Sequence, residues 1–99
     1  MPLVVDPAGS EIGALRKAAR WRGRQILEIG CGDGRLTLRL AALQPGRIEA
    51  MDPDGARVRQ ARKGLPEQYH KLIRYHVGQA ERLRHAKDQF DIVIFSWAL

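Results

Sequence analysis

The sequence lacks the features that would place the protein in a membrane or in an oxidising compartment. Its one cysteine, Cys31, cannot form a disulfide within the chain. No apolar run approaches the roughly 20 residues that a membrane-spanning helix needs. The N-terminus has neither the basic start nor the long apolar stretch of a secretory signal. These absences predict a cytoplasmic protein without a membrane-spanning segment.

Aromatic residues are few, at 6% of the chain, whereas basic residues are plentiful. There are 13 arginines and 4 lysines, and the formal net charge is +6. A basic balance is typical of nucleic-acid-binding proteins, and an RNA-binding domain using Arg16, Lys17, Arg20, Arg22 and Arg24 is one hypothesis. The arginines are spread along the chain with few aromatics near them, which favours solvated helix faces instead.

The hydrophobic period switches repeatedly between strand and helix along a chain of 99 residues, a length that allows one domain. Alternating strands and helices predict an α/β fold, a parallel sheet with flanking helices. Strands are expected at 25–29, 47–52, 71–77 and 90–96. Helices are expected at 35–43, from Pro53 to Leu65, at 79–87, and from Asp6-Pro7 to near Trp21.

The handedness of the connections constrains the order of these four expected strands. Right-handed crossovers give the spatial order 3-2-1-4, counting the strands along the chain. The order reverses between the first and fourth strands. Ligands in such sheets bind at this point, beyond the carboxyl ends of the strands. Here those ends are residues 28–34 and 96–99.

A glycine-rich loop follows the first expected strand, with Gly30, Gly32 and Gly34 at alternate positions. Glycine lets the chain turn tightly and lets a ligand approach the backbone. Asp52 ends the second expected strand, 18 residues after Gly34, where a carboxylate can accept hydrogen bonds from both ribose hydroxyls of an adenosine. Asp54 is better placed to cap the next helix, which leaves Asp52 free. A tight turn without a ligand is the alternative.

Two carboxylates beside this loop, Glu28 and Asp33, indicate the charge of the ligand. In a dinucleotide fingerprint, G-x-G-x-x-G, a pyrophosphate binds at the helix N-terminus. Here the third glycine comes one residue early, and the carboxylates would repel a pyrophosphate. They would attract a sulfonium and an ammonium group. The pattern favours S-adenosylmethionine, and an NAD-binding oxidoreductase is a less favoured alternative.

The segment 26–34, Ile-Leu-Glu-Ile-Gly-Cys-Gly-Asp-Gly, resembles the first motif of the class I S-adenosylmethionine-dependent methyltransferases, and the likeness extends over residues 7–99. The resemblance implies a Rossmann-like fold. It also implies that Gly30 and Gly32 pass under the methionine part of the cofactor, and that Glu28 organises its amino end. Asp52 matches the family's acidic residue on the ribose hydroxyls.

Further cofactor contacts are implied by the same resemblance. In the family, an Asp after the third strand often accepts a hydrogen bond from the adenine amino group. This chain has Gln79 there, and its amide oxygen can accept the same bond. Ser96 and Trp97 would lie near the cofactor's reactive end. The expected cofactor-binding set is Glu28, Gly30, Cys31, Gly32, Asp33, Gly34, Asp52, Pro53, Gln79, Ala80, Ser96 and Trp97.

The function that the resemblance implies is methyl transfer from S-adenosylmethionine to an acceptor that the sequence does not identify: a small molecule, RNA or protein. In-line transfer needs alignment more than acid or base, so we identify no catalytic residue. His70, His76 and His85 lack metal-ligand spacing, so no metal is expected.

The family domain usually has seven strands, and this chain supplies four, so we expect a partial, truncated methyltransferase domain spanning residues 1–99. A non-catalytic S-adenosylmethionine-binding module or a truncated gene product is the alternative. The fourth strand would have an unpaired edge, which predicts a partner chain that covers it.

Overall fold

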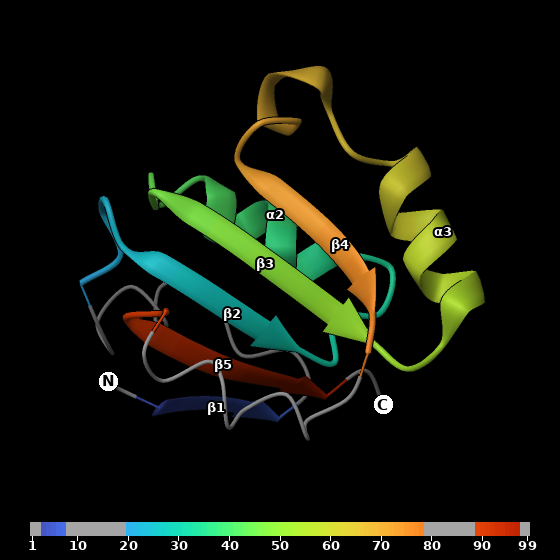
Figure 1. Cartoon of the computed structure of the whole chain (residues 1–99), viewed down its shortest axis with the longest axis horizontal. Helices are drawn as coiled ribbons and strands as arrows, with labels where there is room; N and C mark the ends of the chain where they lie inside the picture. The colour runs from blue at the N-terminus through green and yellow to red at the C-terminus, as the bar shows by residue number, and fades with distance from the viewer. Residues whose placement is uncertain (1–2, 8–19, 79–88, 98–99) are drawn as a thin grey trace.

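One parallel sheet forms the centre of the computed structural model, which describes residues 3–7, 20–78 and 89–97. Neighbouring strands run in the same direction throughout (Figure 1). In spatial order, the described strands are β1 (Leu3–Pro7), β5 (Ile92–Trp97), β2 (Gln25–Ile29), β3 (Arg47–Asp52) and β4 (Ile73–Val77). The sequence of β4, β3, β2 and β5 across the sheet confirms the predicted order 3-2-1-4.

The strand β1 is the main difference from the sequence prediction. Asp6 and Pro7 are expected to start a helix, but both belong to β1, which pairs with β5 from Leu3 opposite Val93 onward. The β-branched residues before Asp6 favour a strand, and pairing satisfies backbone groups along β5 that would otherwise be open. The expected unpaired edge is therefore covered by the chain itself, and the prediction of a partner chain at that edge is wrong. The helix expected after Pro7 falls mainly on residues 8–19, outside the described residues.

Two helices cover one face of the sheet, as the crossover rule predicts. The helix α2 (Arg35–Ala41) begins after Gly34 and lies behind the sheet in Figure 1. The helix α3 (Gly55–Lys63) begins at Asp54, whose side chain accepts hydrogen bonds from the backbone N–H groups of the first turn. Asp54 is thus the N-cap that the sequence predicts. A short 3₁₀ helix (Glu67–Tyr69), which the sequence analysis does not anticipate, connects α3 to β4.

The core has two layers, one on each face of the sheet. Under the helices, Leu40 of α2 and Val58 of α3 pack on alternate residues of the strands, among them Ile26, Ile48 and Ile94. On the opposite face the buried residues are Leu27, Ile29, Met51 and Val93. Within the described part of the chain, no helix is long and apolar enough to cross a membrane. The helix expected at 79–87 lies outside the described residues.

Candidate functional site

The glycine loop turns sharply at the carboxyl end of β2. Gly30, Gly32 and Gly34 have φ values of 85°, 57° and 89°. A Cβ on Gly30 would lie 2.2 Å from the backbone oxygen of Ser96, and one on Gly34 would lie 2.5 Å from the Tyr75 hydroxyl oxygen. Both positions therefore need glycine for its conformation and for its lack of a side chain. The loop packs directly against the end of β5 at Ser96 and against the middle of β4 at Tyr75.

Backbone hydrogen bonds hold this loop against β3. The N–H groups of Gly30 and Cys31 both donate to the carbonyl oxygen of Met51, at 2.8 and 3.0 Å. The N–H of Gly34 donates to the carbonyl of Cys31 at 3.0 Å, which closes the turn that leads into α2. The ends of β2 and β3 are thus fixed relative to each other before any ligand binds.

Asp52 ends β3 beside the glycine loop, and its side chain is only 7% exposed. One carboxylate oxygen accepts a hydrogen bond from the Gly32 N–H and the other from the Asp54 N–H, each at 2.9 Å. Asp52 is free of the helix-capping role, as predicted, but its carboxylate has partners of its own and joins the loops that follow β2 and β3. A carboxylate has about four acceptor positions, so two bonds leave capacity for further donors.

Glu28 is completely buried at the end of β2. Its carboxylate accepts hydrogen bonds from the hydroxyl of Thr37 on α2 and from the hydroxyl of Ser96 on β5, the latter at 2.6 Å. Such bonds offset the cost of removing a carboxylate from water. Through Thr37 and Ser96, Glu28 thus ties β2, α2 and β5 together beneath the glycine loop.

Two groups of this site, the Cys31 thiol and the Tyr75 hydroxyl, have raised pKa values and stay protonated at neutral pH. Burial raises the pKa of the Cys31 thiol far above its usual value, and the negative charges of Glu28 and Asp52 raise it further. A protonated, buried thiol is a poor nucleophile, which agrees with a structural role for Cys31. Burial also raises the pKa of Tyr75 to about 12, so its hydroxyl remains a donor beside the loop.

The third carboxylate, Asp33, is in the loop but is engaged with its neighbour. One oxygen of Asp33 lies 3.3 Å from both the backbone nitrogen and the side-chain Nε of Arg35. Asp33 is thus a weaker source of negative field than Glu28 or Asp52, because an exposed guanidinium group partly balances it.

The structure gathers most of the residues that the sequence predicts. Ser96 lies against the glycine loop, and Pro53 is exposed after Asp52. Gln79 and Ala80, and the side chain of Trp97, lie outside what the structure describes. In the described ranges no group of three His, Cys, Asp or Glu residues could hold a metal ion.

Two residues of the site are missing from the sequence-based set, Thr37 and Tyr75. Thr37 is the one uncharged polar residue of the helix segment 35–41, between Leu36 and Leu38, and this contrast is a signal that could have identified it. Tyr75 is a buried residue of β4, and no sequence signal places its hydroxyl under Gly34. Both lie beneath the loop and support it from below.

Comparisons with known proteins agree with this geometry. The family model described as a methyltransferase domain matches residues 26–99. An S-adenosylmethionine-dependent methyltransferase from Mesorhizobium loti superposes with a TM-score of 0.73 at 25% identity, over 88% of this chain and 39% of that one. The YcgJ protein from Bacillus subtilis superposes with a TM-score of 0.73 at 27% identity, over 85% of this chain and 36% of that one. No curated protein matches the sequence.

A Rossmann-like sheet with a glycine loop and an acidic residue on the next strand defines the class of nucleoside-binding α/β proteins. The family match narrows this class, because it covers residues 26–99 and so includes every described element except β1 and the start of β2. The chain belongs to the methyltransferase domain family. It spans less than half the length of the solved structures that it resembles.

Proposed function

We propose that this chain is the cofactor-binding part of an S-adenosylmethionine-dependent methyltransferase. The observation that carries the proposal is the buried carboxylate of Asp52, bonded to the backbone of the glycine loop at Gly32. The resemblance of the fold to named S-adenosylmethionine-dependent enzymes supports the same cofactor. For the methyl acceptor we favour a small molecule, with RNA and protein as alternatives.

The donors and charges of the site fit a nucleoside that carries positive charge. Asp52 has acceptor capacity left for ribose hydroxyls. Glu28 brings a negative charge to the end of β2, which favours a nearby ammonium group. We therefore assign cofactor binding to the set that the sequence predicts: Glu28, Gly30, Cys31, Gly32, Asp33, Gly34, Asp52, Pro53, Gln79, Ala80, Ser96 and Trp97.

When bound, S-adenosylmethionine supplies both the methyl group and its leaving group. The residues of this chain then need only to bind and orient. Asp52 would fix the sugar, and Glu28, oriented by Thr37 and Ser96, would hold the amino end directly or through water. We assign no acid or base, because in-line transfer depends on alignment of the acceptor.

Calorimetric titration with S-adenosylmethionine and S-adenosylhomocysteine tests the proposal. Asp52→Ala should weaken both ligands by at least about tenfold, because hydrogen bonds to a charged acceptor are lost. Asp54→Ala is the matched control: it removes a nearby carboxylate that serves as a helix cap, and affinity should stay within about threefold. Unchanged affinity in folded Asp52→Ala, or binding of NAD in place of S-adenosylmethionine, would overturn the proposal.

The second candidate is a binding module without catalysis. The residues that we assign at this site bind and orient a ligand and include no acid or base, which is all that such a module needs. An assay with methyl-labelled S-adenosylmethionine separates the two. Label transferred to any acceptor of the three classes supports the enzyme, whereas tight binding without transfer supports the module.

The proposal also includes the cellular location of the protein and the extent of its domain. We propose a cytoplasmic location and a single, partial domain over residues 1–99. The free, buried thiol of Cys31 is compatible with a reducing compartment. Fractionation of cells that express the tagged protein tests the location.

A further inference from the structure

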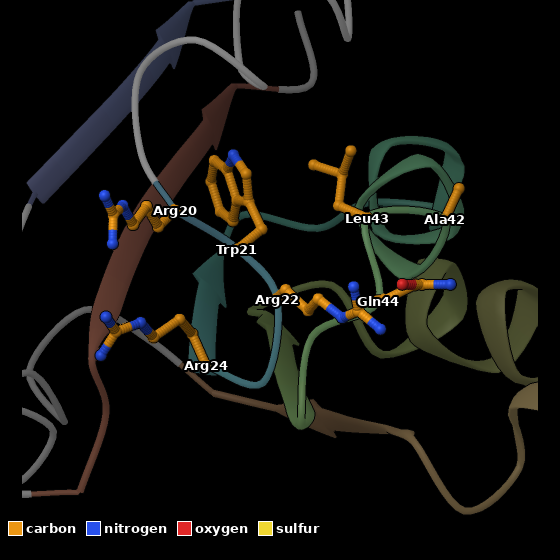
Figure 2. Close-up of a pocket in the computed structure, with 7 residues that line it drawn as sticks. All are labelled: Arg20, Trp21, Arg22, Arg24, Ala42, Leu43 and Gln44. Atoms are coloured by element: carbon orange, nitrogen blue, oxygen red, sulfur yellow. The ribbon is translucent and has the colours of Figure 1, made fainter.

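A pocket lies at the opposite end of the sheet from the glycine loop, where residues 20–24 lead into β2 and where α2 ends (Figure 2). Its volume is about 670 Å³. Gln25 begins β2 and the glycine loop follows its last residue, so about 16 Å of strand separates the two sites. The residues that line the pocket are Arg20, Trp21, Arg22, Arg24, Ala42, Leu43 and Gln44.

The lining of this pocket carries positive charge and no carboxylate. Arg20, Arg22 and Arg24 are exposed, and within the described ranges no ion pair involves them. The sequence contains no Asp or Glu from Ile12 to Leu27. Three exposed guanidinium groups on one short segment create a positive potential that attracts anions. The Asp91 carboxylate, which accepts a hydrogen bond from the Gln25 N–H at 2.8 Å, lies at the end of this segment and offsets only part of that charge.

The backbone that carries the arginines is held in place by the loop after α2. The Arg24 N–H donates to the Trp21 carbonyl at 3.0 Å, which forms a turn, and the Gly23 N–H donates to the Gln44 carbonyl at 2.9 Å. The Arg24 carbonyl accepts from the Gly46 N–H at 2.9 Å. Trp21 is 3% exposed and anchors the same segment in the core. A ligand would therefore have to order only side chains, which lowers the entropic cost of binding.

The arrangement of the side chains favours phosphate among the anions. In Figure 2, Arg20 and Arg24 extend in one direction from the segment, whereas Arg22 extends toward Gln44. The planar guanidinium group donates paired hydrogen bonds to phosphate oxygens. A ligand with several phosphate oxygens can accept from three such groups, whereas a ligand with a single carboxylate cannot neutralise their charge. Trp21 is buried and cannot stack on a base, so the pocket offers contacts to phosphate rather than to bases.

We propose that this pocket binds phosphate groups of an anionic ligand, at a site separate from the glycine loop. Binding would depend mainly on phosphate charge rather than on base identity, because contacts to phosphate carry no sequence information. The phosphate could belong to a nucleic acid backbone or to a small phosphate ester, and one probe of each kind distinguishes these two sources. The proposal does not depend on the cofactor of the first site.

The test compares two triple variants of the full chain. The pocket variant carries Arg20→Ala, Arg22→Ala and Arg24→Ala, which remove the three positive charges that line the pocket. The control variant removes the same charge from exposed residues elsewhere: Arg59→Ala, Lys63→Ala and Arg74→Ala. Fluorescence anisotropy with a labelled 12-nucleotide oligouridylate probes the backbone source, and NMR titration with glycerol 3-phosphate probes the small ester.

We expect the pocket variant to bind at least about tenfold more weakly, and the control to stay within about threefold of the unmodified protein. The dependence of log affinity on log salt should become shallower by about 2 in the pocket variant, as three contacts to a single strand predict. Binding of glycerol 3-phosphate alone identifies a small ester as the ligand class, and binding of the oligouridylate identifies a nucleic acid backbone.

Equal losses in both variants would mean that binding follows net charge, and would overturn the proposal. Absence of binding by both probes to the unmodified protein would overturn it too. If the alanine variant fails to fold by circular dichroism, the triple Arg→Lys variant replaces it. That variant keeps the charge but loses the paired donors, so it should still bind more weakly than the unmodified protein.

Discussion

The two ends of the sheet are built on different physical principles. At the carboxyl end, buried carboxylates of Glu28 and Asp52 are satisfied by hydrogen bonds from within the chain. At the amino end, exposed arginines extend from a turn that is held by backbone hydrogen bonds and by the buried side chain of Trp21. Stability and ligand binding are therefore coupled at the carboxyl end, whereas at the amino end side chains can change with little effect on the fold. The contrast predicts that changes at the carboxyl end cost more unfolding free energy than changes to exposed residues at the amino end.

The largest difference in unfolding free energy should appear when a methyl group is added to one glycine at each end of the sheet. Gly30→Ala places a Cβ 2.2 Å from the Ser96 backbone oxygen, so we expect a loss of more than about 3 kcal/mol of unfolding free energy. Gly23→Ala is the matched control, because Gly23 has a φ of 73° but open space around the added atom. It should cost only about 1 to 2 kcal/mol. Urea unfolding measures both, and equal losses would contradict the contrast.

Removal of the buried Glu28 carboxylate should cause the next largest loss of unfolding free energy. Glu28→Ala leaves the hydroxyls of Thr37 and Ser96 without their acceptor and creates a cavity, so it should cost about 3 kcal/mol. Ser96→Ala removes one donor and should cost about 1 to 2 kcal/mol. In the double variant the losses should fall short of their sum, because one interaction is shared. Full additivity in urea titrations would show that the Ser96–Glu28 bond contributes nothing.

The pH dependence of unfolding should also reflect the carboxyl end. Tyr75 has its pKa raised by burial from 10.0 to about 12. Between these values the unfolded chain releases the phenol proton while the folded chain retains it, so the stability contributed by Tyr75 is lost as pH rises from about 10 to 12. We expect this loss to be about 2 kcal/mol. Tyr75→Phe should flatten that part of the profile. Identical slopes in both proteins, measured by urea unfolding from pH 8 to 12, would contradict this.

The smallest effect should come from the arginines of the amino end. Arg24→Ala removes an exposed side chain and leaves the backbone bonds of the turn in place, so unfolding free energy should change by about 0.5 kcal/mol or less. Thermal unfolding at two salt concentrations measures it. A loss of several kcal/mol would show that the guanidinium group has a structural role.

The sequence predicts the repeating part of this fold well, for a physical reason. Periodicity and turn residues are local properties, so β2 and β3 are found at their expected residues and Asp54 is the expected cap. The strand β1 is missed because its five residues gain their stability from pairing with β5, far along the chain, and not from a local pattern.

The candidate site is predicted in part for the same reason. The glycine spacing and the position of Asp52 can be read locally, and the need of Glu28 for a partner follows from burial. The identity of its partners, Thr37 and Ser96, depends on how α2 and β5 meet over β2, which no local pattern encodes. The bonds that occupy Asp52 arise from the same long-range packing.

The pairing of β1 with β5 has a consequence for the order of folding. Leu3 lies opposite Val93, so this pairing joins residues that lie about 90 positions apart in the chain. Closing so long a loop is entropically costly and slow. During synthesis the segment from Leu3 to Pro7 therefore stays unpaired until β5 has been made, whereas β2, β3 and β4 can assemble earlier, and its apolar residues are open to chaperones in the interval.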